Sequence, residues 1–423
     1  MSQKFDVIVI GASPSGLIAS ILVAKAGRRV ALVEEPLTIS GVRLLSLPAL
    51  KDALGSVPNS EALMRRITQI RAVSTHGRQW AATEYNTADV ESADLVSVEM
   101  DDFLSGLGHL ADSAGVHRRS GFKSLLVEDG KVRGVTTTED EHLYARVTIV
   151  ADGADSRSAA QVAPMAETLA GHQVLYAERL WRFKEGALNM RLNMSAKIGG
   201  LVRISGDVLG RLPGATGWIY PGTNTLSLGL TLPREAADES HLSADKALES
   251  VAAHPAFAPL LAGAAPEARV SQVRDRGGYT RVRRLFGDGW LIAGDAAGLF
   301  DPRCRYELRM EITSGKCAAE AAISAADIND ASAMTLGLYK RMLLDSYVVT
   351  ELRAAEAELA KREKTPDLDA YFPELFVRRL SLGVGAGMTP RVEQQKQFAQ
   401  DTLNERPLWE IIKAGVGGFG LFG

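Results

Sequence analysis

The sequence predicts an α/β protein that combines a Rossmann-like domain, a second domain rich in β-strands, and helices at the C-terminus. Three observations lead to this class. Short apolar segments rich in Val and Ile run into polar, glycine-containing turns near Gly11, Asp152 and Gly294, as buried parallel strands do. Residues 173–232 contain closely spaced strand patterns, and the pattern becomes helical after about residue 330.

The composition is that of a globular protein with more than one domain. With 423 residues, 46% of them hydrophobic and 23% charged, the chain is long enough for two or three domains. The net charge of -3 provides no basic field for nucleic acid. Two cysteines, Cys304 and Cys317, are too few for a disulfide framework. A strand pattern begins close to Met1, where a signal peptide would be expected, and no apolar run approaches the roughly 20 residues that span a bilayer. We therefore expect a cytoplasmic protein with a small-molecule substrate, no nucleic-acid partner and at most peripheral membrane contact.

A complete βαβ unit opens the chain. An apolar strand, Phe5–Ile10, ends at Gly11, and a helix that includes Leu17 is stopped by Gly27. A second strand follows and ends in an acid, Glu34, 23 residues after Gly11. A glycine turn at a helix N-terminus, with an acid at the end of the second strand, is the arrangement that binds dinucleotides.

Each part of this unit has a role in holding a dinucleotide. Gly11 makes the tight turn, the helix amides and dipole hold the pyrophosphate, and Glu34 accepts hydrogen bonds from ribose hydroxyls and disfavours a 2′-phosphate. Ser13 replaces the middle glycine of the G-x-G-x-x-G pattern, which weakens the fingerprint without abolishing it, because a hydroxyl can donate to a phosphate oxygen. The alternative is a Rossmann-like unit that binds nothing. The candidate cofactor-binding residues here are Gly11, Ala12, Ser13, Pro14, Ser15, Gly16, Glu34 and Glu35.

Two further strand patterns end in aspartate and glycine. For Asp295 alone, a turn or helix-capping aspartate is the simpler interpretation. The repetition of strand, aspartate and glycine in order along the chain favours a binding role instead. The candidate residues at these two strand ends are Asp152, Gly153, Gly294 and Asp295.

With these three motifs in order, residues 1–330 resemble the geranylgeranyl reductase family of flavoproteins. That family is close to the electron-transfer-flavoprotein:quinone oxidoreductases and more distantly related to aromatic-ring hydroxylases and flavin-dependent halogenases. The resemblance implies an FAD/NAD(P)-binding domain of the glutathione-reductase type. It also implies that the first motif faces the ADP half of FAD, that Asp152 and Gly153 lie beside the pyrophosphate, and that Gly294 and Asp295 hold a ribityl hydroxyl.

The part of the sequence expected at the flavin ring departs from that family. The family carries a Gly-x-Gly pair in the loop after the third motif, and these two glycines fall on Arg305 and Glu307 here. The family also begins its interdomain helix with an arginine, where this chain has Met100. The sequence therefore predicts a degenerate ring site, in which Arg305, Tyr306 and Glu307 are candidate catalytic residues. A loop that swings out of the site is the alternative.

Three functions remain open on these observations. The first is an FAD-dependent oxidoreductase, either a reductase/dehydrogenase or a monooxygenase, that acts on an apolar polyketide- or isoprenoid-like intermediate of secondary metabolism, with NAD(P)H as the reductant. The second is a non-redox cyclase, isomerase or dehydratase that uses Arg305, Tyr306 or Glu307 for acid–base chemistry in the space of the ring. The third is a catalytically inactive binding partner of another flavoenzyme.

The domain boundaries follow from the strand and helix patterns. We expect a discontinuous FAD-binding domain at residues 1–70, 99–165 and 272–330, a β-rich substrate domain at 71–98 and 166–271, and a C-terminal helical region at 331–423. In the resembling family the Trp-x-Tyr-Pro stretch lines the substrate pocket, so Trp218 and Tyr220 are candidate substrate contacts. Their alternative is an aromatic pair on alternating faces of a core strand. The amphipathic segment that begins at Pro407 is expected to pack onto the body of the protein, with membrane contact as the alternative.

Overall fold

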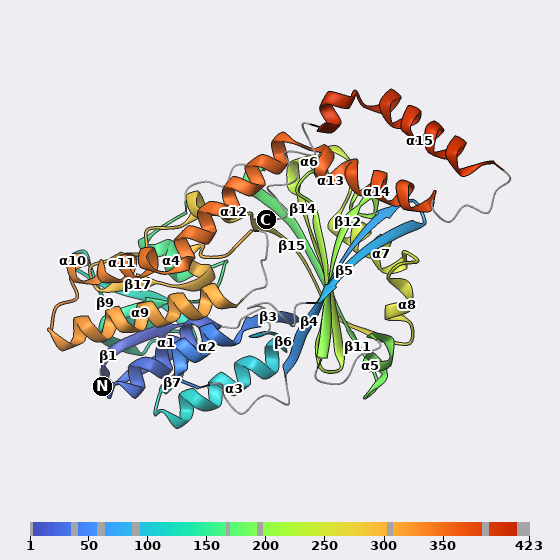
Figure 1. The fold of residues 1–423 in the computed structure, drawn as a ribbon. Coiled ribbons are helices and arrows are strands. Elements are labelled where there is room, and N and C mark those ends of the chain that lie inside the picture. The colour runs from blue at the N-terminus through green and yellow to red at the C-terminus, as the bar shows by residue number, and fades with distance from the viewer. Residues whose placement is uncertain are drawn as a thin grey trace. The chain divides into compact units, whose positions relative to one another are not determined.

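The computed structural model describes residues 3–34, 41–56, 64–86, 94–165, 170–192, 198–302, 308–382 and 389–412 (Figure 1). The chain divides into two compact units, and it enters each of them three times. The first unit contains residues 1–65, 94–168 and 277–356, and the second contains residues 66–93, 169–276 and 357–423. The boundary after Glu356 therefore divides the C-terminal helices between the two units. The sequence instead predicted a single helical region at residues 331–423.

A parallel sheet forms the centre of the first unit. The apolar β1 lies between β10 and β2 and runs parallel to both, and its residues Val7–Ile10 are fully buried. The strand order is β16, β17, β10, β1, β2, β7, and only β16 runs antiparallel to its neighbour on this path. This confirms the predicted Rossmann-like class. The strands are β1 (Gln3–Ile10), β2 (Val30–Glu34), β7 (His117–Ser120), β10 (His142–Val150), β16 (Phe286–Gly287) and β17 (Trp290–Ile292).

Two antiparallel pairs complete the strands of the first unit. β8 (Phe122–Glu128) and β9 (Lys131–Thr137) form a hairpin, and β9 pairs with β10. Both turn residues, Asp129 and Gly130, have positive φ values of 49° and 75°. Positive φ at both central positions is the turn that matches the twist of a hairpin. The other pair consists of β3 (Val42–Ser46) and β6 (Leu95–Glu99).

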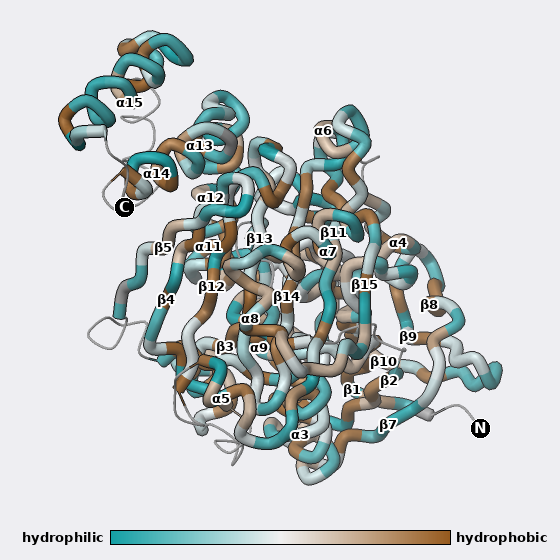
Figure 2. The backbone as a smooth tube through the Cα atoms, turned by 90° about the vertical axis from the view of Figure 1, so that its right-hand side faces the viewer, coloured by the Kyte–Doolittle hydropathy of each residue, from teal (hydrophilic) through white to brown (hydrophobic). Residues whose placement is uncertain are grey.

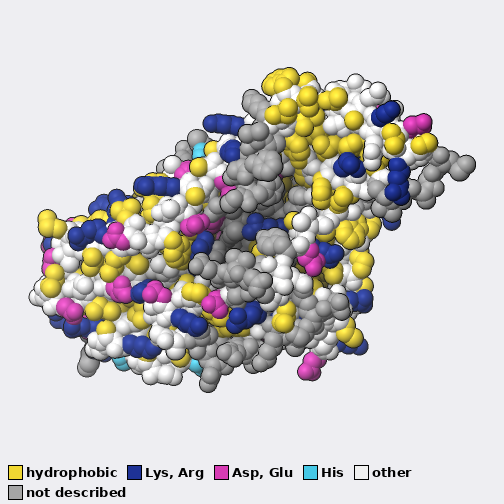
Figure 3. Space-filling view, viewed as in Figure 1, with side chains coloured by type: hydrophobic (Ala, Val, Ile, Leu, Met, Phe, Trp, Pro, Cys, Tyr) yellow, Lys and Arg dark blue, Asp and Glu magenta, His cyan; other side chains and the backbone are white. Residues whose placement is uncertain are grey.

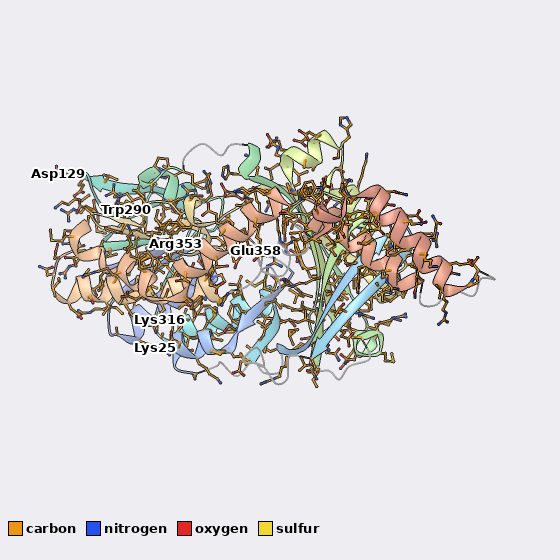
Figure 4. The ribbon with its side chains drawn as sticks, turned by 45° about the horizontal axis from the view of Figure 1, so that its top comes forward. Lys25, Asp129, Trp290, Lys316, Arg353 and Glu358 are labelled. Atoms are coloured by element: carbon orange, nitrogen blue, oxygen red, sulfur yellow. The ribbon has the colours of Figure 1, made fainter. Side chains whose placement is uncertain are left out.

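The helices of the first unit pack along this sheet. α1 (Pro14–Lys25) contacts both α9 (Arg309–Asp327) and α3 (Met100–Ser113); Figure 4 labels Lys25 on α1 and Lys316 on α9. Met100, at the position where the resembling family has an arginine, is 1% exposed and belongs to the apolar core. The remaining helices of this unit are α2 (Leu47–Leu54), α4 (Arg157–Val162), α10 (Ala333–Leu336) and α11 (Leu338–Asp345).

The second unit is built on a mainly antiparallel sheet, as the sequence predicts. Its strand order is β15, β11, β14, β13, β12, β4, with β5 paired to β4, and only β12 and β4 are parallel. Apolar residues of one face, such as Leu228 and Leu230, form a core with α7 (Ala244–Ala253). The strands are β4 (Met64–His76), β5 (Gln79–Asn86), β11 (Gln173–Arg182), β12 (Ile198–Gly206), β13 (Thr216–Pro221), β14 (Thr225–Pro233) and β15 (Ala265–Asp275).

The C-terminal helices begin with α12 (Tyr347–Lys364) and continue with α13 (Asp367–Ala370), α14 (Phe372–Ser381) and α15 (Arg391–Glu405). Figure 2 shows that teal, hydrophilic residues dominate α15. Beyond it, Leu408, Trp409 and Ile412 are 58%, 62% and 55% exposed, so the expectation that this segment packs onto the body is wrong for the described residues. No helix in the described ranges is long and apolar enough to cross a membrane.

Candidate functional site

The three sequence motifs meet at one edge of the parallel sheet. Ile10 pairs with Val150, and Val150 pairs with Ile292, so β1, β10 and β17 end side by side. The turn at Gly11, the Asp152–Gly153 turn and the Gly294–Asp295 turn follow these strand ends directly. In open parallel sheets, ligands bind outside the carboxyl ends of the strands, so this edge is the candidate site.

The glycines of the first motif allow very close backbone contacts. Gly11 has φ 96°, and a Cβ added there would lie 2.4 Å from the carbonyl oxygen of Ala151 and 2.6 Å from Cα of Asp152. A Cβ at Gly16 would lie 2.0 Å from the carbonyl oxygen of Gly11. A side chain at Gly11 would therefore push the first and second motifs apart, and one at Gly16 would disrupt the turn of the first motif itself.

Ser13 begins the helix in place of the family's glycine. Its Oγ accepts a hydrogen bond from the amide of Gly16 at 3.2 Å and lies 2.9 Å from Oγ of Ser15. Ser13 is the N-cap of α1 and is 2% exposed. An N-cap side chain satisfies one of the amides that the first helical turn leaves unpaired. The serine therefore fits the turn, and its contact with a phosphate remains a prediction.

Asp152 organises its own loop. Its Oδ2 accepts hydrogen bonds from the Ser158 hydroxyl at 2.7 Å and the Ser158 amide at 3.3 Å, and its Oδ1 accepts from the Ser156 hydroxyl. Ser156 in turn caps α4 by accepting from the Ala159 amide at 2.9 Å. Both carboxylate oxygens thus hold the turn at Gly153, and the backbone of that turn faces the candidate site.

The third motif contacts the first through glycine. Gly294 has φ 63°, and a Cβ there would lie 2.3 Å from Oγ of Ser15. Its amide donates to the Ser314 hydroxyl at 3.0 Å, which ties the motif to α9. A Cβ at Gly315, also on α9, would lie 2.4 Å from the carbonyl oxygen of Ser15. The first turn of α1 is therefore enclosed by small residues of two other segments.

Glu311 is a member of this site that the sequence analysis missed. It lies in the first turn of α9, and its carboxylate accepts a hydrogen bond from the backbone amide of Ser15. Part of Glu311 remains accessible to solvent. Burial of its carboxyl group and the charge of Asp295 nevertheless raise the pKa of Glu311 well above its ordinary value. Arg43 and the Ser15 amide act in the opposite direction and lower this pKa. The available signal was an acidic residue at the start of the alanine-rich segment that follows the loop at Glu307.

A cavity of about 950 Å³ lies beside Glu34 in the first unit. Glu34 receives a hydrogen bond from Arg118 on its Oε1, and Arg118 also binds Asp112 at 2.6 Å. Lys123 and Arg157 line the same cavity, so cationic side chains outnumber the one acid there. On the face shown in Figure 3, acidic and basic side chains of the first unit are otherwise intermixed. The cavity size, the acid and the cations fit the ADP half of a dinucleotide.

The predicted ring-site residues cannot be placed. Arg305, Tyr306 and Glu307 lie outside the described residues, as does Glu35. Their proposed roles therefore stay predictions.

Trp218 and Tyr220 lie on one face of the second unit's sheet. They are two residues apart on β13, their ring centroids are 6.3 Å apart, and Trp218 stacks on Tyr176 at 6.1 Å. The alternative that placed them on alternating faces is therefore wrong. The same face carries Glu178, whose carboxylate accepts hydrogen bonds from the hydroxyls of Tyr176 and Ser227. This polar and aromatic face is opposite the one that forms the apolar core.

The fold and the three strand-end motifs have the arrangement of a dinucleotide-binding protein. Residues 6–190 match the family described as glucose inhibited division protein A. Protein FixC of Azotobacter vinelandii is 24% identical over 427 residues, with 97% of each chain covered. A geranylgeranyl bacteriochlorophyll reductase-like protein from Thermoplasma acidophilum has a TM-score of 0.68 at 18% identity, with 94% of this chain and 100% of that chain covered.

A second similar structure is PqsL, a probable FAD-dependent monooxygenase from Pseudomonas aeruginosa. Its TM-score is 0.60 at 15% identity, with 89% of this chain and 99% of that chain covered. These comparisons confirm the resemblance to geranylgeranyl reductase-like flavoproteins and the α/β fold of the FAD-binding type.

Proposed function

We propose that this protein is an FAD-dependent reductase, dehydrogenase or monooxygenase that acts on an apolar small molecule, such as a polyketide- or isoprenoid-like intermediate, and takes electrons from NAD(P)H. The observation that carries the proposal is the convergence of three glycine motifs at the carboxyl edge of one parallel sheet, beside a cavity of about 950 Å³.

The chain supplies a binding surface for the ADP half. Gly11 and Gly16 bring backbone amides to the strand ends, and the α1 dipole favours a pyrophosphate there. Glu34, aligned by Arg118, presents a carboxylate to ribose hydroxyls. Asp152 acts indirectly, because its carboxylate holds the turn at Gly153 in place. When bound, FAD would supply the hydride or oxygen transfer, for which the protein provides position and electrostatics.

The aromatic face of the second unit supports an apolar substrate. Trp218 and Tyr220 are 5% and 7% exposed, and they offer flat apolar surface next to the hydrogen-bonded Glu178. Binding sites for small apolar molecules combine such surface with a few polar groups. In this proposal Trp218 and Tyr220 position the substrate, and Glu178 with Tyr176 orients a polar substituent of it.

One observation favours the non-redox alternative. Glu311 accepts a hydrogen bond from the Ser15 amide, in the first turn of α1, where a pyrophosphate would also need amide donors. A carboxylate there competes with a second anion. The alternative enzyme would retain the fold and use acid–base groups, with Arg305, Tyr306 and Glu307 as its predicted candidates.

Flavin content and reduction distinguish the two functions. We expect the purified full chain to carry or take up FAD, to be bleached anaerobically by NAD(P)H or dithionite, and to be reoxidised by apolar acceptors. The Glu34→Ala variant should bind FAD more weakly, whereas Glu128→Ala, at the exposed end of β8, should not change the affinity. A chain that stays colourless in excess FAD would exclude the redox function and support the alternative.

A further inference from the structure

Three polar side chains from separate segments meet in the second unit, away from the glycine motifs. His76 ends β4, Asp207 follows β12, and Glu374 lies in the first turn of α14. One ligand-type atom from each lies within 4.8 Å of the others. All three residues belong to the second unit, so the cluster is formed within one compact body.

The cluster contains buried polar atoms that make no hydrogen bond. Nδ1 of His76 and Oδ1 of Asp207 have no hydrogen-bond partner among the described residues. Nδ1 of His76 lies 3.3 Å from Oε2 of Glu374, and Glu374 itself is only 8% exposed. A buried polar atom that makes no hydrogen bond costs free energy, and a bound cation would satisfy such an atom.

We propose that His76, Asp207 and Glu374 bind a divalent transition-metal cation of the Zn²⁺ type, through Nδ1, Oδ1 and Oε2 respectively. One imidazole nitrogen and two carboxylate oxygens are ligands that such ions take, with water completing a tetrahedral set. Metal–ligand bonds of about 2.0–2.1 Å place neighbouring tetrahedral ligands about 3.3–3.4 Å apart, which matches the separation of His76 Nδ1 and Glu374 Oε2.

The second oxygen of each carboxylate is held by another group. The Gly77 amide donates to Oδ2 of Asp207 at 2.5 Å, and the Arg211 guanidinium pairs with Oε1 of Glu374. This leaves Oδ1 and Oε2 to face His76. Outer contacts of this kind orient the ligands of metal sites.

The backbone around Asp207 is also constrained. Gly206 has φ 102°, and a Cβ there would lie 2.4 Å from the carbonyl oxygen of Thr75, so the turn before Asp207 packs tightly against the end of β4. His254 lies with Nε2 3.1 Å from the Gly77 carbonyl oxygen and further fixes the β4–β5 turn. Two of the three ligands are thus preorganised, and the third joins α14 to this sheet.

The competing interpretation is an ion-pair network without metal. In it a protonated His76 lies between Glu374 and Asp207, and Arg211 adds a second positive charge. Such a network needs no cation from solution. The two interpretations therefore predict different numbers of bound metal ions per chain, which can be measured.

Equilibrium dialysis of the full chain against ZnCl₂, followed by elemental analysis, tests the proposal. We expect one zinc per chain, and a visible d–d absorption of tetrahedral intensity when Co²⁺ replaces Zn²⁺. His76→Ala and Glu374→Gln should each weaken Zn²⁺ binding at least about tenfold, while His109→Ala, which removes an exposed histidine of the first unit, should bind like wild type.

A second readout separates loss of the site from loss of the fold. The conservative Asp207→Asn variant should retain wild-type circular dichroism and FAD affinity but lose the rise in Tm that Zn²⁺ causes in wild type. Wild-type protein that binds no stoichiometric zinc, or binds it equally well after His76→Ala, would overturn the proposal and leave the ion-pair network. Because flavin binding is measured separately, either outcome is independent of the proposed function.

Discussion

The backbone amide of Ser15 donates a hydrogen bond to the carboxylate of Glu311. Ser15 lies in the first turn of α1 and Glu311 in the first turn of α9, so one carboxylate receives the positive ends of two helix dipoles. The nearby Asp295 carboxylate opposes this arrangement, and Arg43 supports it. A charged Glu311 therefore occupies part of the electrostatic environment that a pyrophosphate would use.

The Glu311→Gln variant should bind FAD more tightly than wild type at pH 7. The substitution replaces an ionisable carboxyl group near the pyrophosphate position with a neutral amide and keeps the shape of the side chain. We expect a gain of about tenfold in affinity, or ~1.4 kcal/mol, measured by fluorescence titration with FAD. Glu128→Gln, at the exposed end of β8, is the matched control and should leave the affinity unchanged. Weaker binding by Glu311→Gln would instead show that the carboxylate contacts the cofactor favourably.

The raised pKa of Glu311 predicts a pH dependence of stability. Between the ordinary pKa of 4.5 and its higher value in the folded protein, the folded state binds more protons than the unfolded state. The stability that this group contributes is therefore complete below about pH 4.5 and is lost as the pH rises through the raised pKa. Urea denaturation over a pH series should show that the free energy of unfolding declines less with rising pH in Glu311→Gln than in wild type. Parallel curves for the two proteins would contradict the prediction.

The Asp152→Ala variant should loosen the turn at Gly153. It leaves the hydroxyls of Ser156 and Ser158 without their acceptor, which should lower the free energy of unfolding by about 1–3 kcal/mol. FAD affinity should fall with it, because the turn backbone moves. Asp155→Ala, an exposed neighbour, serves as the control in both denaturation and titration. If FAD affinity is retained in Asp152→Ala, the turn does not contribute to cofactor binding.

The Gly229→Ala variant tests the aromatic face. Its Cβ would lie 2.1 Å from Cζ2 of Trp218, so the indole must move, at a cost of about 1–3 kcal/mol. With an apolar substrate in hand, KM should rise while FAD affinity remains that of wild type. Gly106→Ala, with nothing within 4 Å of the added atom, is the control and should not change KM. An unchanged KM in Gly229→Ala despite a changed Trp fluorescence would remove Trp218 from the substrate site.

Cys317 should be an unreactive thiol in the folded protein. Burial raises its pKa from 9.0 to about 11, which lowers the thiolate fraction near pH 8 about 100-fold. Alkylation by iodoacetamide, followed in a Cys304→Ser background, should be slower than in the urea-unfolded chain by at least that factor. Equal rates in the two states would show that the thiol is accessible.

Local sequence rules were sufficient for most elements of the fold. The βαβ unit from Phe5 to Glu34 is marked by an apolar strand, a glycine turn and a helix stop, and the structure contains all three. The hairpin at Asp129 and Gly130 follows from turn residues alone. The three motifs also imply their own meeting point, because parallel strands in a single sheet end at the same edge.

Only the tertiary structure decided which side chains act together. The partner of the Ser15 amide, the loop-holding role of Asp152 and the cluster of His76, Asp207 and Glu374 each join segments or atoms whose sequence spacing carries no signal. The helix that crosses Glu356 continues without interruption, so its pattern could not show where one unit gives way to the next. Local patterns record the conformation of each segment, whereas contacts between distant segments depend on how their surfaces pack, and packing is a property of the folded chain alone.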